Sequence, residues 1–181
     1  MLEQDVKEIL LTEEQLKEIV VRLGKEITED YRGKNLLMIG ILKGSVVFMS
    51  DLMRHIDLKC RIDFMSVSSY GSGTKSTGNV RILKDLDIDL DGYDVLLIED
   101  ILDSGNTLAY VRSLLATRGA KSIKICTLLD KPSRRTADIH ADFVGSEVGD
   151  EFVIGYGLDF DEKYRNLPYL GVPHPYVYSG N

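Results

Sequence analysis

The sequence is poor in the features that mark secreted and membrane-bound proteins. It has two cysteines, no tryptophan and four prolines among 181 residues. Cys60 and Cys126 lie far apart and neither belongs to a CxxC pair, so we expect free thiols in a reducing compartment. The first residues lack a signal-peptide pattern, and no apolar run approaches the roughly 18 residues of a membrane-spanning helix. We therefore predict a cytoplasmic protein with no membrane partner.

An excess of positive charge is also missing. The chain carries 29 acidic and 22 basic residues, a formal net charge of -7, and its pI is about 5.0. Proteins that bind nucleic acid broadly present a basic surface, so we expect no nucleic-acid partner. The length suits a single domain whose core needs neither disulfides nor a structural metal.

Apolar runs typical of buried strands alternate with amphipathic segments through the middle of the chain. Thr12 and Gln15 have the spacing of a capping box at the start of a long helix. The predicted helices are 12–31, 46–56 and 105–118, and the predicted strands are 35–42, 60–70, 80–83, 94–100, 121–130, 142–148 and 152–159. This alternation predicts an α/β fold with an open, mostly parallel sheet flanked by helices.

Two kinds of segment fall outside that pattern. The glycine-rich stretch 71–79 has no apolar anchor, so we expect a mobile loop, and the proline-containing tail is predicted to be irregular. Within a single domain of residues 1–181, we expect the core to span roughly 35–131. Residues 1–34 and 132–181 are expected to form a small hood over one end of the sheet.

The stretch VLLIEDILDSGNTL, residues 95–108, carries the chemistry. Glu99 and Asp100 end a predicted strand, and ligands of open α/β sheets bind beyond the carboxyl ends of strands. The turn DSGNT, residues 103–107, supplies backbone N–H groups, hydroxyls and a helix N-terminus, which suit a phosphate. Carboxylates suit sugar hydroxyls or Mg²⁺. Together they describe a site for a ribose 5-phosphate, with Asp103 placed as a base, although the turn alone would be explained by Asp103 as an N-cap.

The same stretch resembles the PRPP-binding motif of the type I phosphoribosyltransferases, in the form found in hypoxanthine-guanine phosphoribosyltransferases. The resemblance extends from about Glu8 to Gly171. ILKGS (41–45) is similar to the pyrophosphate loop, and SSYGSGTKSTG (68–78) to the flexible loop that closes the site. LLDKPSRR (128–135) and DEFVIGYGLDFDEKYRNLPYLG (150–171) are similar to the purine-recognition region. The family fold and a cis peptide before Lys43 are therefore implied.

The resemblance also implies an activity and a role for each matching residue. The activity is Mg²⁺-dependent transfer of the 5-phosphoribosyl group of PRPP to a 6-oxopurine, giving IMP or GMP and pyrophosphate. The residues implied to hold PRPP are Glu99, Asp100, Asp103, Ser104, Gly105, Asn106 and Thr107, with Asp103 also the catalytic base. Those implied for pyrophosphate are Lys43, Gly44, Ser69, Tyr70 and Arg165. Those implied for the purine are Lys131, Phe152, Val153 and Asp159. Glu99, Asp100 and Asp159 are implied to lie at the metal.

Other interpretations stay open at this point. Without the resemblance, Lys131 would be a solvated lysine, Phe152 a core residue and Arg165 a surface arginine. A PRPP-sensing regulator that binds RNA or DNA is a second hypothesis, which the acidic pI disfavours. A phosphoribosyltransferase for xanthine or a pyrimidine is a third. The family tends to form dimers and tetramers, so the resemblance also implies a homo-oligomer.

Overall fold

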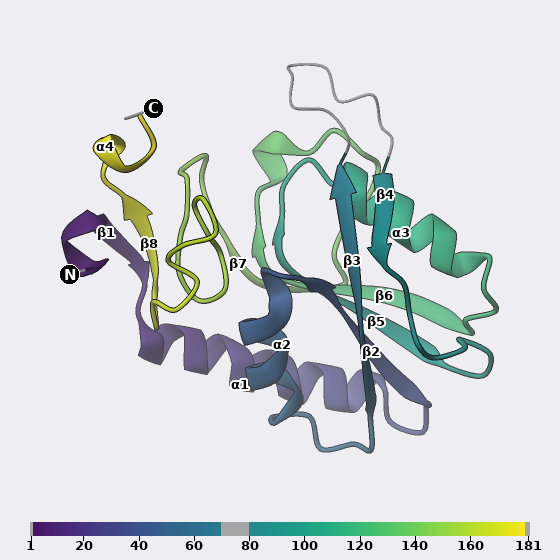
Figure 1. The fold of residues 1–181 in the computed structure, drawn as a ribbon. Helices are drawn as coiled ribbons and strands as arrows, with labels where there is room; N and C mark the ends of the chain where they lie inside the picture. Colours follow the sequence, from purple (N-terminus) through teal and green to yellow (C-terminus); the bar gives the residue numbers. More distant parts are fainter. Residues whose placement is uncertain (1, 70–79, 180–181) are drawn as a thin grey trace.

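A computed structural model of the chain describes residues 2–69 and 80–179 and has a six-stranded sheet at its centre (Figure 1). The strand order is β4-β3-β2-β5-β6-β7. The strands are β2 (Leu36–Leu42), β3 (Arg61–Ser69), β4 (Val80–Lys84), β5 (Asp94–Leu102), β6 (Ser122–Asp130) and β7 (Phe143–Glu147). Every neighbouring pair is parallel except β3 and β4. The predicted open, mostly parallel α/β sheet is confirmed.

Helices cover both faces of this sheet. Helices α1 (Glu13–Asp30) and α2 (Ser45–Met53) pack on one face, and α3 (Asn106–Ala116) packs on the other. Successive strand residues point to opposite faces, so Met38 lies in the core beneath α1 while Leu37 and Ile39 lie in the core beneath α3. Burial on both faces explains why the central strands are uninterrupted apolar runs in the sequence.

Helix α1 begins as the capping-box spacing predicts. The N–H of Gln15 donates to Oγ1 of Thr12 at 3.3 Å, and the N–H of Thr12 donates to Oε1 of Gln15 at 2.9 Å. Beyond the helix, the fully buried Tyr31 donates its hydroxyl to the carbonyl of Val95 at 3.0 Å, which ties α1 to β5. This helix therefore belongs to the core layer on the main sheet.

The chain ends form a second, two-stranded sheet of β1 (Val6–Leu11) and β8 (Leu170–Pro173). The short helices η1 (Leu2–Asp5) and α4 (Pro175–Tyr178) flank it, and η2 (Pro132–Arg134) follows β6. The prediction of an irregular tail is wrong here, because β8 pairs with a strand from the other end of the chain. The predicted strand 152–159 is also wrong: that segment makes isolated bridges and turns.

The hood boundaries, 1–34 and 132–181, stay a prediction. Since α1 and β7 pack with the main sheet, the arrangement favours a smaller hood made of the β1–β8 sheet and the segments beside it. Across residues 2–69 and 80–179, every helix is too short or too polar to cross a bilayer. Cys126 is buried, Cys60 is partly exposed, and both thiols are free.

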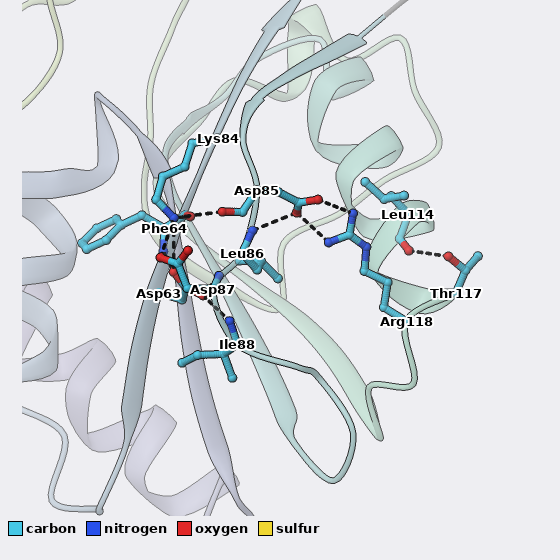
Figure 2. Close-up of polar contacts among 10 residues, drawn as sticks. All are labelled: Asp63, Phe64, Lys84, Asp85, Leu86, Asp87, Ile88, Leu114, Thr117 and Arg118. Carbon is cyan, nitrogen blue, oxygen red and sulfur yellow. Dashed lines mark hydrogen bonds and ion pairs between the residues drawn. The ribbon is translucent and has the colours of Figure 1, made fainter.

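A buried carboxylate on β3 accepts hydrogen bonds from the segment 85–93, which connects β4 to β5 (Figure 2). Asp63 on β3 is 6% exposed, and its Oδ2 accepts the N–H groups of Asp87 and Ile88 at 2.8 and 3.1 Å. Arg118, just beyond α3, donates to both oxygens of Asp85 at 2.6 and 2.8 Å, which lowers the pKa of Asp85. These contacts fix β4 beside β3 at one edge of the sheet.

Candidate active site

The turn predicted to hold a phosphate joins β5 to α3. Gly105 has φ +80°, in the left-handed region that favours glycine, and a Cβ there would lie 2.5 Å from Cγ2 of Ile139. A cavity of about 100 Å³ opens at this turn; it is lined by Glu99, Ile101, Leu102, Asp103, Ser104, Gly105, Thr107 and Leu108. Asn106 is the one residue of the predicted turn that does not line this cavity, and its side-chain amide donates to Oγ1 of Thr136 at 3.1 Å. The backbone N–H groups of the first helical turn and the helix dipole favour an anion in this cavity.

Glu99 and Asp100 belong to the last four residues of β5, which extends to Leu102 rather than ending at residue 100. Both carboxylates keep some exposed surface but are crowded by protein atoms. Burial raises the pKa of each, and the charge of Asp100 raises the pKa of Glu99 further. Two carboxylates that are costly to ionise side by side are a favourable place for a cation.

The predicted pyrophosphate loop follows β2 and touches the acid pair. The peptide between Leu42 and Lys43 is cis, as the resemblance implied. A Cβ on Gly44 would lie 1.6 Å from Oδ2 of Asp100, so the loop backbone rests directly against that carboxylate. Gly157, at φ +105°, also approaches the loop closely, since a Cβ there would lie 2.2 Å from the carbonyl oxygen of Gly44.

The segment that follows Gly157 brings charged groups to this loop. Arg165 pairs with Asp159 at 2.9 Å and donates to the carbonyl of Gly157 at 2.7 Å. Glu162 pairs with Nζ of Lys43 at 2.7 Å and approaches Arg165 at 3.4 Å. The structure therefore brings together the two cations predicted to bind pyrophosphate, with Glu162 between them.

Three of the predicted base-recognition residues, Lys131, Phe152 and Val153, lie near the end of β6, whereas the fourth, Asp159, pairs with Arg165. Lys131 is 5% exposed, and its ammonium donates to the carbonyl of Glu151 at 2.5 Å, so the interpretation as a solvated lysine is wrong. Phe152 is 44% exposed, so the interpretation as a core residue is wrong too, whereas Val153 is buried. Asp103 lies nearby, because the N–H of Lys131 donates to the carbonyl of Leu102 at 3.0 Å.

Asp103 presents a side chain that is 45% exposed at this turn. Its Oδ1 is buried and, among the residues that the structure describes, meets no hydrogen-bond partner. Its Oδ2 lies 3.9 Å from Arg134, which also pairs closely with Asp150. A partly exposed carboxylate beside the predicted phosphate turn is placed to take a proton from a substrate.

Two predicted pyrophosphate residues, Ser69 and Tyr70, come at the end of β3 and directly after it. Ser69 is the last residue of β3, whereas Tyr70 and the predicted mobile loop 71–79 lie outside the described residues.

The sequence reasoning missed Arg135, whose side chain is 11% exposed. Its guanidinium donates to the carbonyls of Leu102, Asp103 and Ile139 at 3.2, 2.9 and 2.7 Å and pairs with Asp130. It thereby fixes the start of the phosphate turn. The sequence shows two adjacent arginines after a proline, and nothing local separates the buried one from its solvated neighbour.

Comparisons with known proteins point to one family. The family model described as "Phosphoribosyl transferase domain" matches residues 7–161. The hypoxanthine-guanine phosphoribosyltransferase of Bacillus subtilis (strain 168) is 56% identical over 179 residues, covering 99% of each chain. The enzyme of the same name from Staphylococcus aureus (strain Mu50) is 57% identical over 175 residues, covering 97% of this chain and 98% of its own.

Solved structures give the same result. A crystal structure of a hypoxanthine phosphoribosyltransferase from Staphylococcus aureus superposes with a TM-score of 0.95 at 55% identity, covering 98% of this chain and 96% of that one. Sequence and fold agree over nearly the whole length. The chain therefore belongs to the phosphoribosyltransferase family and, within it, to the hypoxanthine-guanine phosphoribosyltransferases.

Proposed function

We propose that this protein is a purine-salvage enzyme that transfers the 5-phosphoribosyl group of PRPP to N9 of hypoxanthine or guanine. The bond from C1′ to a pyrophosphate oxygen breaks, the bond from C1′ to N9 forms, and the base loses a ring proton. The observation that carries the proposal is the buried Lys131. Its ammonium donates to the carbonyl of Glu151, next to Phe152, and its backbone N–H donates to the carbonyl of Leu102, just before the turn 103–107. A lysine ammonium has only donors, so it selects a 6-oxo purine over a 6-amino purine.

Each group of side chains has a task in this reaction. The turn 103–107 binds the 5′-phosphate, and Glu99 and Asp100 accept hydrogen bonds from the ribose hydroxyls. The carboxylate of Asp103, whose side chain is 45% exposed, takes the proton that leaves the purine ring. Lys43 and Arg165 bind the departing pyrophosphate, for which the planar fork of an arginine is apt. Phe152 stacks on the base while the backbone of Val153 meets its edge.

Mg²⁺ fits the acid pair, although the protein alone offers no closed cage. Among the described residues, no group of three or more His, Cys, Asp or Glu side chains is placed to hold a metal. Mg²⁺ usually keeps several waters and is bound by one or two carboxylates plus substrate oxygens, which matches Glu99 and Asp100. The bound ion would neutralise charge on the leaving pyrophosphate. Asp159 pairs with Arg165 here, and its contribution to the metal stays a prediction.

The test is a turnover assay with PRPP, Mg²⁺ and one base at a time: hypoxanthine, guanine, xanthine, adenine or uracil. We expect IMP and GMP, little XMP, and no AMP or UMP. Asp103→Ala should lose about a hundredfold or more of the rate. No nucleotide with any base, despite measurable PRPP binding, would contradict the enzyme and favour the nucleic-acid-binding regulator.

Lys131→Met separates base recognition from PRPP binding. It keeps the length of the side chain and removes the donors, so we expect KM for hypoxanthine to rise at least tenfold or so, while PRPP affinity measured by calorimetry is unchanged. Lys121→Met is the matched control, because Lys121 is exposed just before the opposite end of β6. Equal kinetics for both variants would contradict the role of Lys131.

We also expect the enzyme to act in the cytoplasm as a homo-oligomer, a dimer or a tetramer. Light scattering of the purified protein measures the oligomeric state directly.

A further inference from the structure

Phe152 is held at the surface by two other aromatic rings. Its ring centroid lies 5.8 Å from that of Phe160, at an interplanar angle of 87°, and 5.8 Å from that of Tyr178, at 49°. Phe160 belongs to the same irregular segment as Phe152, whereas Tyr178 comes from α4 at the far end of the chain. Edge-on and tilted contacts of this kind are favourable and orient the rings relative to one another.

The position of Tyr178 is set by the opposite end of the chain. Asp5 accepts the hydroxyl of Tyr164 at 2.9 Å on one carboxylate oxygen. The hydroxyl of Tyr176 lies 3.1 Å from the other carboxylate oxygen and 2.8 Å from the carbonyl oxygen of Gln4, the residue before Asp5. The carbonyl of Asp5 also accepts the N–H of His174, the residue before α4, at 2.8 Å. Together with the pairing of β1 and β8, these bonds hold α4 beside the N-terminus (Figure 1).

The contact between Tyr178 and Phe152 adds little to the core. Tyr178 and Phe152 remain nearly half exposed, at 45% and 44%, and α4 contains no buried residue. The bonds to Asp5 thus hold a surface helix whose last residue lies against the one aromatic ring assigned to the purine. If Tyr178 served to stabilise the fold, its ring would be buried. A ring that is half exposed and held in a fixed orientation against Phe152 is better suited to positioning that side chain.

We propose that Tyr178 is a positioning residue for the purine base, held by Asp5, that fixes the ring of Phe152 for stacking. The inference rests on the proposed function, and it adds a base-affinity element formed by the two chain ends. Without the Tyr178 ring, Phe152 keeps only Phe160 as an aromatic neighbour within the described residues and samples more orientations. Ordering it again on binding then weakens affinity for the base.

The experiment compares Tyr178→Ala and Tyr178→Phe with the wild type by steady-state kinetics and by calorimetric titration with GMP. We expect Tyr178→Ala to raise KM for hypoxanthine and Kd for GMP about threefold to tenfold, with KM for PRPP within about twofold. Tyr178→Phe should match the wild type, because the ring and not the hydroxyl makes the contact. Tyr110→Ala, which removes a 39% exposed tyrosine of α3, is the matched control.

Asp5→Ala tests the support behind Tyr178. It should weaken the binding of base and GMP about as much as Tyr178→Ala does. The double variant Asp5→Ala/Tyr178→Ala should bind them no more weakly than whichever single variant binds them less tightly, because both substitutions act through one ring. Thermal melts of each variant separate this effect from general unfolding.

The outcomes distinguish the inference from the proposed function. Unchanged KM and GMP affinity in Tyr178→Ala, in an enzyme that forms IMP and GMP, would overturn the inference alone. Tighter binding in that variant would also overturn it, since the ring would then block the base. If the wild type makes no nucleotide but binds GMP, and Tyr178→Ala binds GMP more weakly, the inference is supported and the proposed activity is contradicted. A wild type that neither turns over nor binds GMP would overturn both.

Discussion

A methyl group at position 44 tests whether the pyrophosphate loop and the acid pair form one site. Gly44 has φ −57° and ψ −36°, an ordinary right-handed conformation that alanine adopts without strain. Any cost of Gly44→Ala must therefore come from the new methyl group and not from the backbone.

That methyl carbon would lie 1.6 Å from Oδ2 and 2.5 Å from Cγ of Asp100. Contacts of this length are impossible, so the carboxylate or the loop has to move by about 1 Å or more. Asp100 resists the movement, because its Oδ1 accepts the N–H of Ile101 at 2.7 Å. A misplacement of about 1 Å near a reacting centre costs roughly a hundredfold in rate, and overpacking costs about 1–3 kcal/mol of stability.

The assay is nucleotide formation over a series of PRPP concentrations, with a thermal melt of the same samples. We expect kcat/KM for PRPP to fall about a hundredfold, while Val46→Ala, which shortens a 39% exposed side chain two residues further on, leaves it unchanged. Gly44→Ala with the kinetics and Tm of the wild type would refute the contact between the loop and Asp100.

Two further substitutions test the electrostatics and the buried arginine. Burial and the charge of Asp100 raise the pKa of Glu99 in the folded state above its value in the unfolded state. Between these two pKa values the folded state binds more protons than the unfolded state, so the free energy of unfolding falls as pH rises through this window. Glu99→Gln cannot ionise and should be more stable above that window by about 1 kcal/mol or more, about 2–4 °C in Tm. The gain should vanish in acid; metal-free melts across pH measure it, and a gain that persists there would contradict the cause. Arg135→Lys keeps the charge but loses the planar fork of donors. We expect the free energy of unfolding, measured in urea, to fall by about 1.5–3 kcal/mol, and KM for PRPP to rise. Arg134→Lys, at a half-exposed neighbour, should cost less than about 0.5 kcal/mol, and equal losses would refute the difference.

The elements that the sequence predicted are those with a local cause. Helix α1 follows from its capping box and apolar stripe, and the central strands follow from apolar runs that are buried on both faces. The turn 103–107 was also recognisable, because glycine, hydroxyl residues and a following helix are contiguous in the chain. Local patterns of this kind determine an element before its partner is known.

The elements that the sequence did not predict depend on partners far along the chain. Strand β1 shows little burial, and its antiparallel partner β8 lies at the other terminus, so neither has a strong pattern of its own. Arg135 gained its role from three carbonyls presented by two separate segments. Such contacts exist only once the sheet has assembled.

The burial of Lys131 could not be predicted from the residues around it in the sequence. A lysine before a proline is ordinarily solvated, and nothing around it in the sequence indicates burial. In the structure it is 5% exposed, and among the described residues the carbonyl of Glu151 is the one acceptor that its ammonium meets. A buried ammonium with donors to spare is costly until another acceptor arrives. A 6-oxo group would supply that acceptor, whereas a 6-amino group would present further donors, so the proposed selectivity for a 6-oxo base rests on the hydrogen bonds that this lysine still lacks.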